Sequence, residues 1–260
     1  MENTKTKLRK PSIVLCEFCG QHIESFIIKV PFLPKKQMIV NQTCRCIIEK
    51  RKKEDIIARN QKIKEILYKR GFETGKYSLM TFDRWNLNRD DMQVIKKVYD
   101  YINIINKANN RNWLYMHGEN GLGKTHMAIA SARQIAANNL WEPCIVRWSE
   151  YCTLIQQSWH DQSLRPDWHF TRQSRILVLD DIDKKPSTQW ALGQLYEILD
   201  IRDINNLPTI ITANRSISEL SEFWSKSFDT KDLSRSIISR IMGQIFKVIY
   251  FKGEDYRFLT

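Results

Sequence analysis

The sequence predicts an α/β protein with a mostly parallel sheet of five strands and flanking helices, preceded by a small basic region with two cysteine pairs. From residue 77 onward, short apolar runs alternate with amphipathic stretches of helix length, which is typical of βα units. One apolar run leads directly into a glycine-rich loop. Of the 260 residues, 42% are hydrophobic and 27% are charged, which excludes collagen-like, coiled-coil and wholly disordered chains.

The basic character of the chain is concentrated in its N-terminal region. Glycines between Gly71 and Lys76 end a long helical pattern, so we expect domains at 1–76 and 77–260. The first region has a net charge of +10 and the second +2. A helix with one apolar stripe is predicted over Cys44–Arg70, and another surface must cover that stripe. Its basic run is either a solvated face or a surface for nucleic acid or an acidic partner.

Five apolar runs in the second region predict the strands of the sheet. They are 113–117, 144–148, 175–180, 209–213 and 246–251. Parallel strands are covered on both faces, and ligands bind in the crevice at their carboxyl ends. Polar residues that directly follow these strands are therefore candidates for a functional site.

The strongest motif follows the run 113–117 and precedes a predicted helix that begins near Lys124. It matches G-x-x-x-x-G-K-[ST], and its residues are Gly118, Glu119, Asn120, Gly121, Leu122, Gly123, Lys124 and Thr125. Glycines let backbone N–H groups close around phosphate oxygens, and the helix N-terminus adds positive potential. We expect Lys124 to reach the β- and γ-phosphates of ATP and the Thr125 hydroxyl to hold Mg²⁺. A purely structural glycine turn is the alternative.

Polar side chains also follow the strands 175–180 and 209–213. Asp180 is the candidate Mg²⁺ ligand, and Asp181 is the candidate that polarises the attacking water. Asn214 is a candidate for orienting a water or contacting the γ-phosphate. The alternatives are a helix cap or loop turn for the carboxylates and a turn-forming role for the asparagine.

Four cysteines in the first region form two close pairs, Cys16 with Cys19 and Cys44 with Cys46. A C-x₂-C pair followed by a second pair is typical of a zinc site, in which four thiolates surround a tetrahedral ion. The shorter spacing of the second pair is less usual, and His22 is a candidate substitute ligand. Reduced thiols without metal are the alternative.

The order of these motifs resembles that of the AAA+ ATPases, and more narrowly the DnaC, DnaI and IstB group of helicase loaders and transposition ATPases. The resemblance runs from Phe72 to the C-terminus. It includes the lead-in Met80–Asp83, the stretch Gly123–Ala128 and the ending Gly253–Arg257. It implies ATP and Mg²⁺ as cofactors, a P-loop strand near the centre of the sheet, and Asn214 as the residue called sensor 1.

The resemblance also assigns Arg240, in the sequence Ser239-Arg240-Ile241, as an arginine finger that reaches the nucleotide of a neighbouring subunit. That role implies a homo-oligomer that forms on ATP binding. From the residues alone, Arg240 is an ordinary surface arginine. Asp181 stands where a glutamate is usual, which predicts weak hydrolysis. The chain ends soon after its last strand, so we expect no separate helical lid, and Arg257 is a candidate sensor 2 substitute.

Aromatic and basic residues alternate between Ser149 and Gln173. The resemblance implies that this region helps to bind single-stranded DNA, so Arg165, Trp168 and Arg172 are candidate contacts. Core packing is the alternative for large aromatic side chains. The remaining thiols, Cys144 and Cys152, fall within a predicted strand and helix, where we expect them to pack in the core.

Together these features predict an ATP-dependent helicase loader in DNA replication. The zinc region would bind the replicative helicase, the AAA+ module would bind ATP and single-stranded DNA, and hydrolysis stimulated by DNA or partner would release the helicase. Similar loaders carry a cysteine cluster followed by a basic helix. The alternatives are an IstB-like transposition ATPase on duplex DNA and an adaptor that uses ATP as a switch without hydrolysis.

No apolar run approaches the ~18 residues of a membrane-spanning helix. The N-terminus also lacks the longer apolar block of a signal peptide. We therefore expect a cytoplasmic protein without membrane contact.

Overall fold

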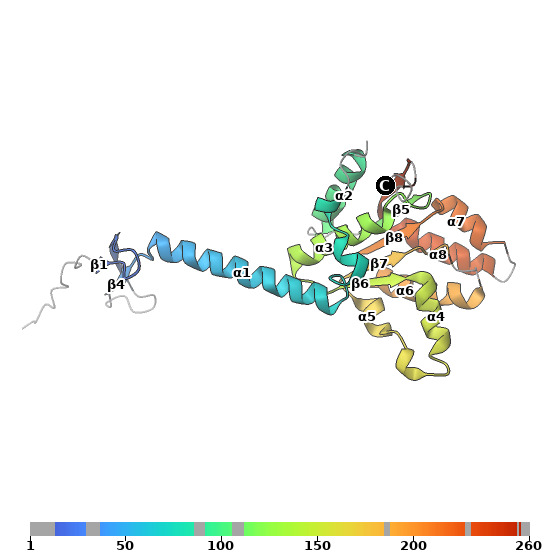
Figure 1. Cartoon of the computed structure of the whole chain (residues 1–260), viewed down its shortest axis with the longest axis horizontal. Coiled ribbons are helices and arrows are strands. Elements are labelled where there is room, and N and C mark those ends of the chain that lie inside the picture. Colours follow the sequence, from blue (N-terminus) through green and yellow to red (C-terminus); the bar gives the residue numbers. More distant parts are fainter. Residues whose placement is uncertain are drawn as a thin grey trace, which may run out of the picture. The chain divides into compact units, whose positions relative to one another are not determined.

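The computed structural model describes residues 14–29, 37–85, 92–105, 112–184, 188–226, 230–253 and 255, and Figure 1 labels many of its helices and strands. The chain divides into two compact units, Met1–Gln61 and Lys62–Thr260. The division falls inside a helix, before the glycines at which the domain boundary was predicted.

The first unit contains two small antiparallel sheets and most of a long helix. Its elements are β1 (Val14–Leu15), β2 (His22–Ile23), β3 (Ser25–Lys29), β4 (Gln37–Asn41) and the first part of α1 (Arg45–Lys69). α1 contains no glycine or proline, so no residue interrupts its backbone hydrogen bonds. Among the described residues, no helix combines the length and apolar character needed to cross a membrane.

The apolar stripe predicted on α1 is buried near its C-terminal end. Leu67 is only 5% exposed and, with Phe72, joins the core of the second unit. Ile56 and Ile57 are 58% and 65% exposed. The segment 62–76, assigned to the first region from the sequence, therefore packs with the second unit, because its apolar side chains leave water there.

The second unit is built on a five-stranded parallel sheet, as predicted. Its helices are η1 (Gly75–Leu79), η2 (Phe82–Arg84), α2 (Met92–Ile105), α3 (Lys124–Asn139), α4 (Trp148–Gln157), η3 (Gln162–Leu164), α5 (Trp168–Gln173), α6 (Gln189–Ile204), α7 (Ile217–Trp224) and α8 (Lys231–Gln244). Its strands are β5 (Trp113–Gly118), β6 (Pro143–Arg147), β7 (Ile176–Asp180), β8 (Thr209–Ala213) and β9 (Ile245–Phe251). Each predicted strand lies within one residue of its observed bounds.

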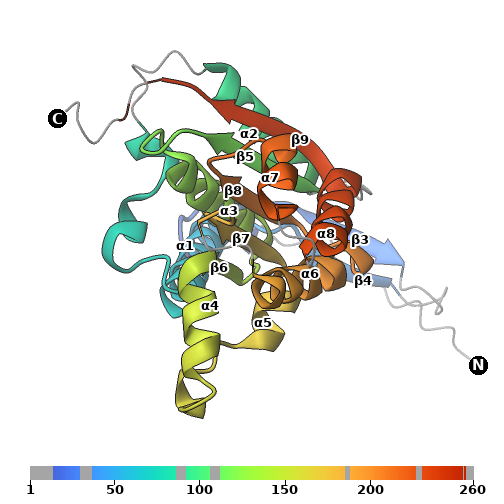
Figure 2. The ribbon, with the colours of Figure 1, turned by 90° about the vertical axis from the view of Figure 1, so that its right-hand side faces the viewer.

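The strand order is β6-β7-β8-β5-β9, so β9 forms one edge beside β5 (Figure 2). The P-loop strand β5 is interior but next to the edge strand, and β8 occupies the centre. This order places the carboxyl ends of β7, β8 and β5 side by side, because neighbouring parallel strands end at the same edge of a sheet.

Two layers of apolar side chains cover the sheet. Alternate residues of β5 point to opposite faces: Trp113 and Tyr115 pack with α4, α6, α7 and α8, while Leu114 and Met116 pack with α2 and α3. Cys144 and Cys152 lie in the first of these layers, so the predicted core packing of both thiols is confirmed.

A buried arginine joins the starts of β7 and β8. Arg202, on α6, is 0% exposed and donates hydrogen bonds to the carbonyls of Ser174 (3.0 Å) and Pro208 (2.5 Å) and to Thr209 Oγ1 (2.8 Å). Its hydrogen-bond acceptors in the described part of the chain are neutral carbonyl and hydroxyl oxygens. Burial lowers the pKa of Arg202 to about 9, which still leaves the guanidinium charged at neutral pH.

Candidate functional site

The loop between β5 and α3 turns sharply, and its glycines fit that turn. Gly123 has a φ of 84° and Gly121 a φ of 77°, both in the left-handed region that glycine adopts without strain. A Cβ atom on Gly121 would also lie 1.9 Å from Oδ1 of Asp255, so a larger residue there would require that side chain to move. α3 begins at Lys124, as predicted, which directs its N-terminus into the loop.

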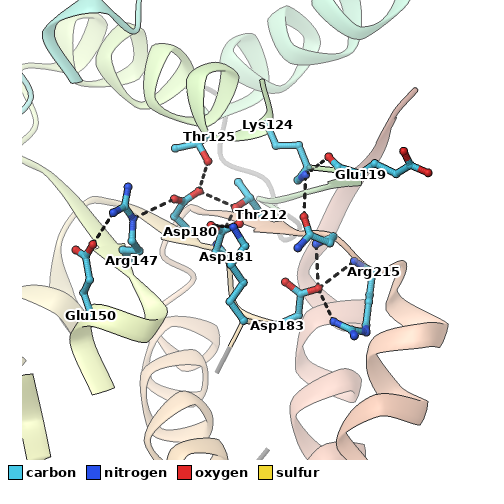
Figure 3. Close-up of polar contacts among 12 residues, drawn as sticks. Glu119, Lys124, Thr125, Arg147, Glu150, Asp180, Asp181, Asp183, Thr212 and Arg215 are labelled. Carbon is cyan, nitrogen blue, oxygen red and sulfur yellow. Dashed lines mark hydrogen bonds and ion pairs between the residues drawn. The ribbon is translucent and has the colours of Figure 1, made fainter. Parts of the chain in front are cut away.

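Lys124 is held at the centre of this loop. Its Nζ donates to the carbonyl oxygens of Gly118 (2.8 Å) and Glu119 (2.6 Å) and to Oδ1 of Asn214 (3.1 Å). Lys124 is 6% exposed, and burial lowers the pKa of its ammonium group. The Glu119 side chain extends away from Lys124 (Figure 3). The structure therefore brings together the lysine and the amide that were predicted to contact phosphate.

Asp180 lies at the end of β7 and accepts two hydroxyl hydrogen bonds. Its Oδ1 lies 2.7 Å from Oγ1 of Thr125 and 2.8 Å from Oγ1 of Thr212. Asp180 is 2% exposed, and burial followed by the charge of Asp181 raises its pKa. Hydroxyl and carboxylate oxygens are the ligands that Mg²⁺ prefers, so Thr125 and Asp180 fit the predicted magnesium site.

Asp181 is the first residue after β7 and has a left-handed backbone, with a φ of 58°. Aspartate tolerates this conformation better than most residues with a side chain. The backbone N–H of Asp181 donates to Thr212 Oγ1 at 2.9 Å, and its Oδ2 accepts from Lys184 Nζ at 2.7 Å. These contacts fix Asp181 beside Asp180, with its carboxylate paired to a lysine.

The loop and the carboxylates face one cavity of about 570 Å³, within the range of small-molecule sites. Its walls combine loop residues, carboxylates and cations. The lining residues are Lys76, Met80, Asn120, Gly121, Gly123, Lys124, Thr125, His126, Arg147, Ser149, Glu150, Asp180, Asp181 and Lys184. Asn214 is not one of these lining residues, but it accepts a hydrogen bond from Lys124, which is. The excess of lysine and arginine suits a polyphosphate.

Sequence reasoning missed three cations of this cavity, Lys76, Arg147 and Lys184. Arg147 ends β6 in register with Asp180, and its Nε lies 3.9 Å from Asp180 Oδ2. A charged residue next to the last position of the predicted strand 144–148 was the available signal for Arg147. Lys76 and Lys184 gave no such signal, because each lies outside a strand.

Arg240 does not line this cavity. Its Nε donates to Asp200 Oδ1 at 2.6 Å, its Nη2 donates to the Tyr196 hydroxyl at 2.6 Å, and its guanidinium lies 4.4 Å from the Tyr196 ring centroid. The proposed arginine finger is thus bound to α6 of its own chain. Arg257, the candidate sensor 2 substitute, lies outside the described residues.

The four N-terminal cysteines lie together. Their Sγ atoms are all within 4.8 Å of one another, and the close contacts Cys16–Cys46 and Cys19–Cys44 measure 3.4 and 3.5 Å. Zinc–sulfur bonds of about 2.3 Å in a tetrahedron place sulfurs roughly 3.8 Å apart, so the arrangement fits zinc. Hydrogen bonds from the backbone of Cys19 and Phe18 lower the pKa of Cys16 to about 6. His22 is exposed and is not a member of this group.

The candidate DNA contacts on α5 and before it are largely engaged within the chain. Trp168 packs against the core, and Arg172 stacks on its ring at 4.3 Å and pairs with Glu197. Arg165 lies 5.8 Å from the same ring. Trp159, by contrast, is 64% exposed and meets Trp190 edge to face at 5.6 Å. Trp159 is therefore more accessible than Trp168 in this region.

Comparison with known proteins identifies a family that matches most of this chain. The family model described as IstB-like ATP binding protein matches residues 53–260. The replicative helicase loader DnaI of Bacillus subtilis is 28% identical over 137 residues, which is 52% of this chain and 44% of that protein.

Two solved structures share the fold. A crystal structure of DnaI superposes with a TM-score of 0.57 at 24% identity, over 70% of this chain and 93% of that one. The DnaC helicase loader superposes with a TM-score of 0.54 at 21% identity, over 69% of this chain and all of that one. The matched segments span about half the length of the curated relatives, between 44% and 54%.

Proposed function

The chain belongs to the family of IstB-like ATP-binding proteins, and from that premise we propose that it is an ATPase that loads a replicative DNA helicase. The observation that carries the ATPase assignment is one cavity that receives Lys124 and Thr125 from the loop after β5 and Asp180 and Asp181 from the end of β7, two strands that both pair with β8. The relatives that load helicases support the biological role.

Each residue of the cavity has a distinct task in this proposal. The N–H groups at the start of α3 and the Lys124 ammonium hold the phosphates of ATP, and Thr125 and Asp180 hold Mg²⁺. An Mg²⁺ ion held by these oxygens would supply positive charge to offset that of the phosphates. Asp181 accepts a proton from the attacking water, and Asn214, fixed beside Lys124, contacts the γ-phosphate.

The proposed arginine finger requires a change of partner. Arg240 must leave Asp200 and Tyr196 before its guanidinium can reach a nucleotide in a neighbouring subunit of a homo-oligomer. An arginine delivered this way stabilises charge on the transferring phosphoryl group. The pairing with Asp200 therefore supports an ATPase that turns over slowly until subunits assemble.

We expect Asp181→Glu to raise basal ATP turnover and Asp181→Asn to lower it about 100-fold, with nucleotide affinity unchanged in both. The longer carboxylate extends the reach of the base toward water, whereas the amide cannot accept the proton; a positioned base contributes roughly 10²–10⁴-fold. Steady-state phosphate release and calorimetric titration measure the two effects.

Asp232→Asn is the matched control for this pair, since Asp232 lies on α8 with its side chain 97% exposed. Its turnover should equal that of the wild-type protein. Slower turnover by Asp181→Glu, or unchanged turnover by Asp181→Asn, would remove the general-base role.

A second candidate function is an adaptor that uses ATP as a switch without hydrolysis. The pairing of Asp181 with Lys184 favours it, because an engaged carboxylate is a weaker base. A third, favoured by the family match, is a transposition ATPase that works on duplex DNA.

One set of experiments separates the three. ATP turnover is measured without DNA, with single-stranded DNA and with duplex DNA, and the helicase is captured from a bacterial lysate in the presence of ATP. The proposed loader hydrolyses ATP faster with single-stranded DNA and captures the helicase. Preference for duplex DNA without capture supports the transposition ATPase, and capture without turnover supports the adaptor.

A further inference from the structure

The turn after β7 is bound to the end of β8 at three successive residues. Asp181 donates its N–H to Thr212 Oγ1, and Ile182 donates its N–H to the Thr212 carbonyl oxygen at 3.1 Å. The third residue, Asp183, makes the connection with its side chain. The turn that carries the candidate base and the turn that carries Asn214 are therefore one hydrogen-bonded unit.

Asp183 has a fully buried carboxylate. Its side chain is 0% exposed, and its Oδ2 accepts hydrogen bonds from the backbone N–H groups of Asn214 (3.0 Å) and Arg215 (3.2 Å) and from Arg215 Nη1 (3.0 Å), as Figure 3 shows in part. Oδ1 has no partner among the described residues. Burying a carboxylate is unfavourable unless charged or hydrogen-bonded partners compensate it. These hydrogen bonds therefore hold the Asp183 carboxylate against the turn after β8.

Asn214 connects this carboxylate to the cavity. Its backbone N–H is held by Asp183, and its side-chain Oδ1 accepts from Lys124 Nζ at 3.1 Å. Asp183 itself does not line the cavity. Hydrogen bonds therefore connect Asp183 to the phosphate-binding loop through Asn214 and Lys124, and its charge also acts on Lys124 through space.

We infer that Asp183 is a positioning residue that sets the Asn214 amide for contact with the γ-phosphate. The inference rests on the proposed ATP-binding function. A carboxylate bonded to the Asn214 N–H restricts the backbone from which the amide projects, so the amide meets a third phosphate without further ordering. ADP lacks that phosphate, so the positioning acts on ATP and not on ADP.

The test is calorimetric titration of the full chain with Mg-ATP and with Mg-ADP. We expect Asp183→Asn to lower the preference for ATP over ADP by about 2- to 10-fold, the effect of one hydrogen bond, with ADP affinity unchanged. Asp203→Asn, which alters a carboxylate bonded to Gln244 on α8, is the matched control and should keep the wild-type preference. Asp183→Ser provides a smaller neutral variant if the amide does not fold.

A double-mutant cycle separates positioning from general support of the turn. In an Asn214→Ala background, Asp183→Asn should no longer change the ATP preference, because the amide that it positions is absent. An equal change with and without Asn214, or no change in the wild-type background, overturns the inference. Failure of the wild-type protein to bind ATP refutes the proposed function itself. That outcome is distinct from normal ATP binding by the wild-type protein with an unchanged ATP preference in Asp183→Asn, which refutes only the inference.

Discussion

Lys124→Ala is expected to bind ATP about 10- to 100-fold more weakly than the wild-type chain, the effect of losing a charged hydrogen-bond donor to phosphate. The Lys124 Nζ lies at the centre of the P-loop, within 3.1 Å of three oxygen atoms of the surrounding turns. Alanine retains the helix but removes the cation that faces the phosphates. Calorimetric titration with Mg-ATP measures the change.

The control for this variant is Lys96→Ala, which removes an exposed lysine of α2 and should bind ATP normally. Thermal unfolding of both variants establishes whether the second unit remains folded. Unchanged ATP affinity in folded Lys124→Ala would refute the P-loop assignment.

Removal of the cysteine ligands is expected to abolish both zinc binding and helicase capture while ATP binding persists. The wild-type chain should contain one zinc ion, and Cys16→Ser with Cys19→Ser should contain none. Four thiolates supply folding free energy that two small sheets with little core cannot supply themselves. ATP binding persists because the second unit has its own sheet and apolar layers.

Elemental analysis and capture of the helicase measure this prediction. Cys144→Ser is the matched control: it removes a thiol of the sheet core and should keep the zinc. Two results would contradict the proposal. One is wild-type protein free of zinc after purification without chelator, and the other is a double variant that still captures the helicase.

The strands and the P-loop could be predicted because each depends on a local pattern. The apolar run 176–179 that ends at Asp180 predicts a buried strand wherever it stands in the chain, and Gly123-Lys124 needs only a strand before it and a helix after it. The order of the strands depends on contacts between distant segments, and only the resemblance indicated that the P-loop strand lies near the centre, where β5 is found beside the central strand β8.

Contacts between distant residues explain what the sequence did not reveal. The role of Asp183 depends on a turn that begins with the left-handed backbone of Asp181, a conformation that residue propensities disfavour. The engagement of Arg240 by Asp200 joins helices that are separated in sequence by a strand and a further helix. The sequence predicted that the apolar stripe of this helix would be covered, but not that Leu67 would join the second unit, since the helix looks continuous from Arg45.

The buried Arg202 has a consequence for how the second unit assembles. Its guanidinium can leave water only when the Ser174 carbonyl, the Pro208 carbonyl and the Thr209 hydroxyl are all in place, because a partly dehydrated cation is strongly unfavourable. Docking of α6 should then be cooperative with the pairing of β7 and β8. No folding intermediate in which β7 and β8 have paired without α6 would then be populated. Asp180 and Asn214 lie at the opposite ends of these strands, so they reach their final spacing when α6 docks.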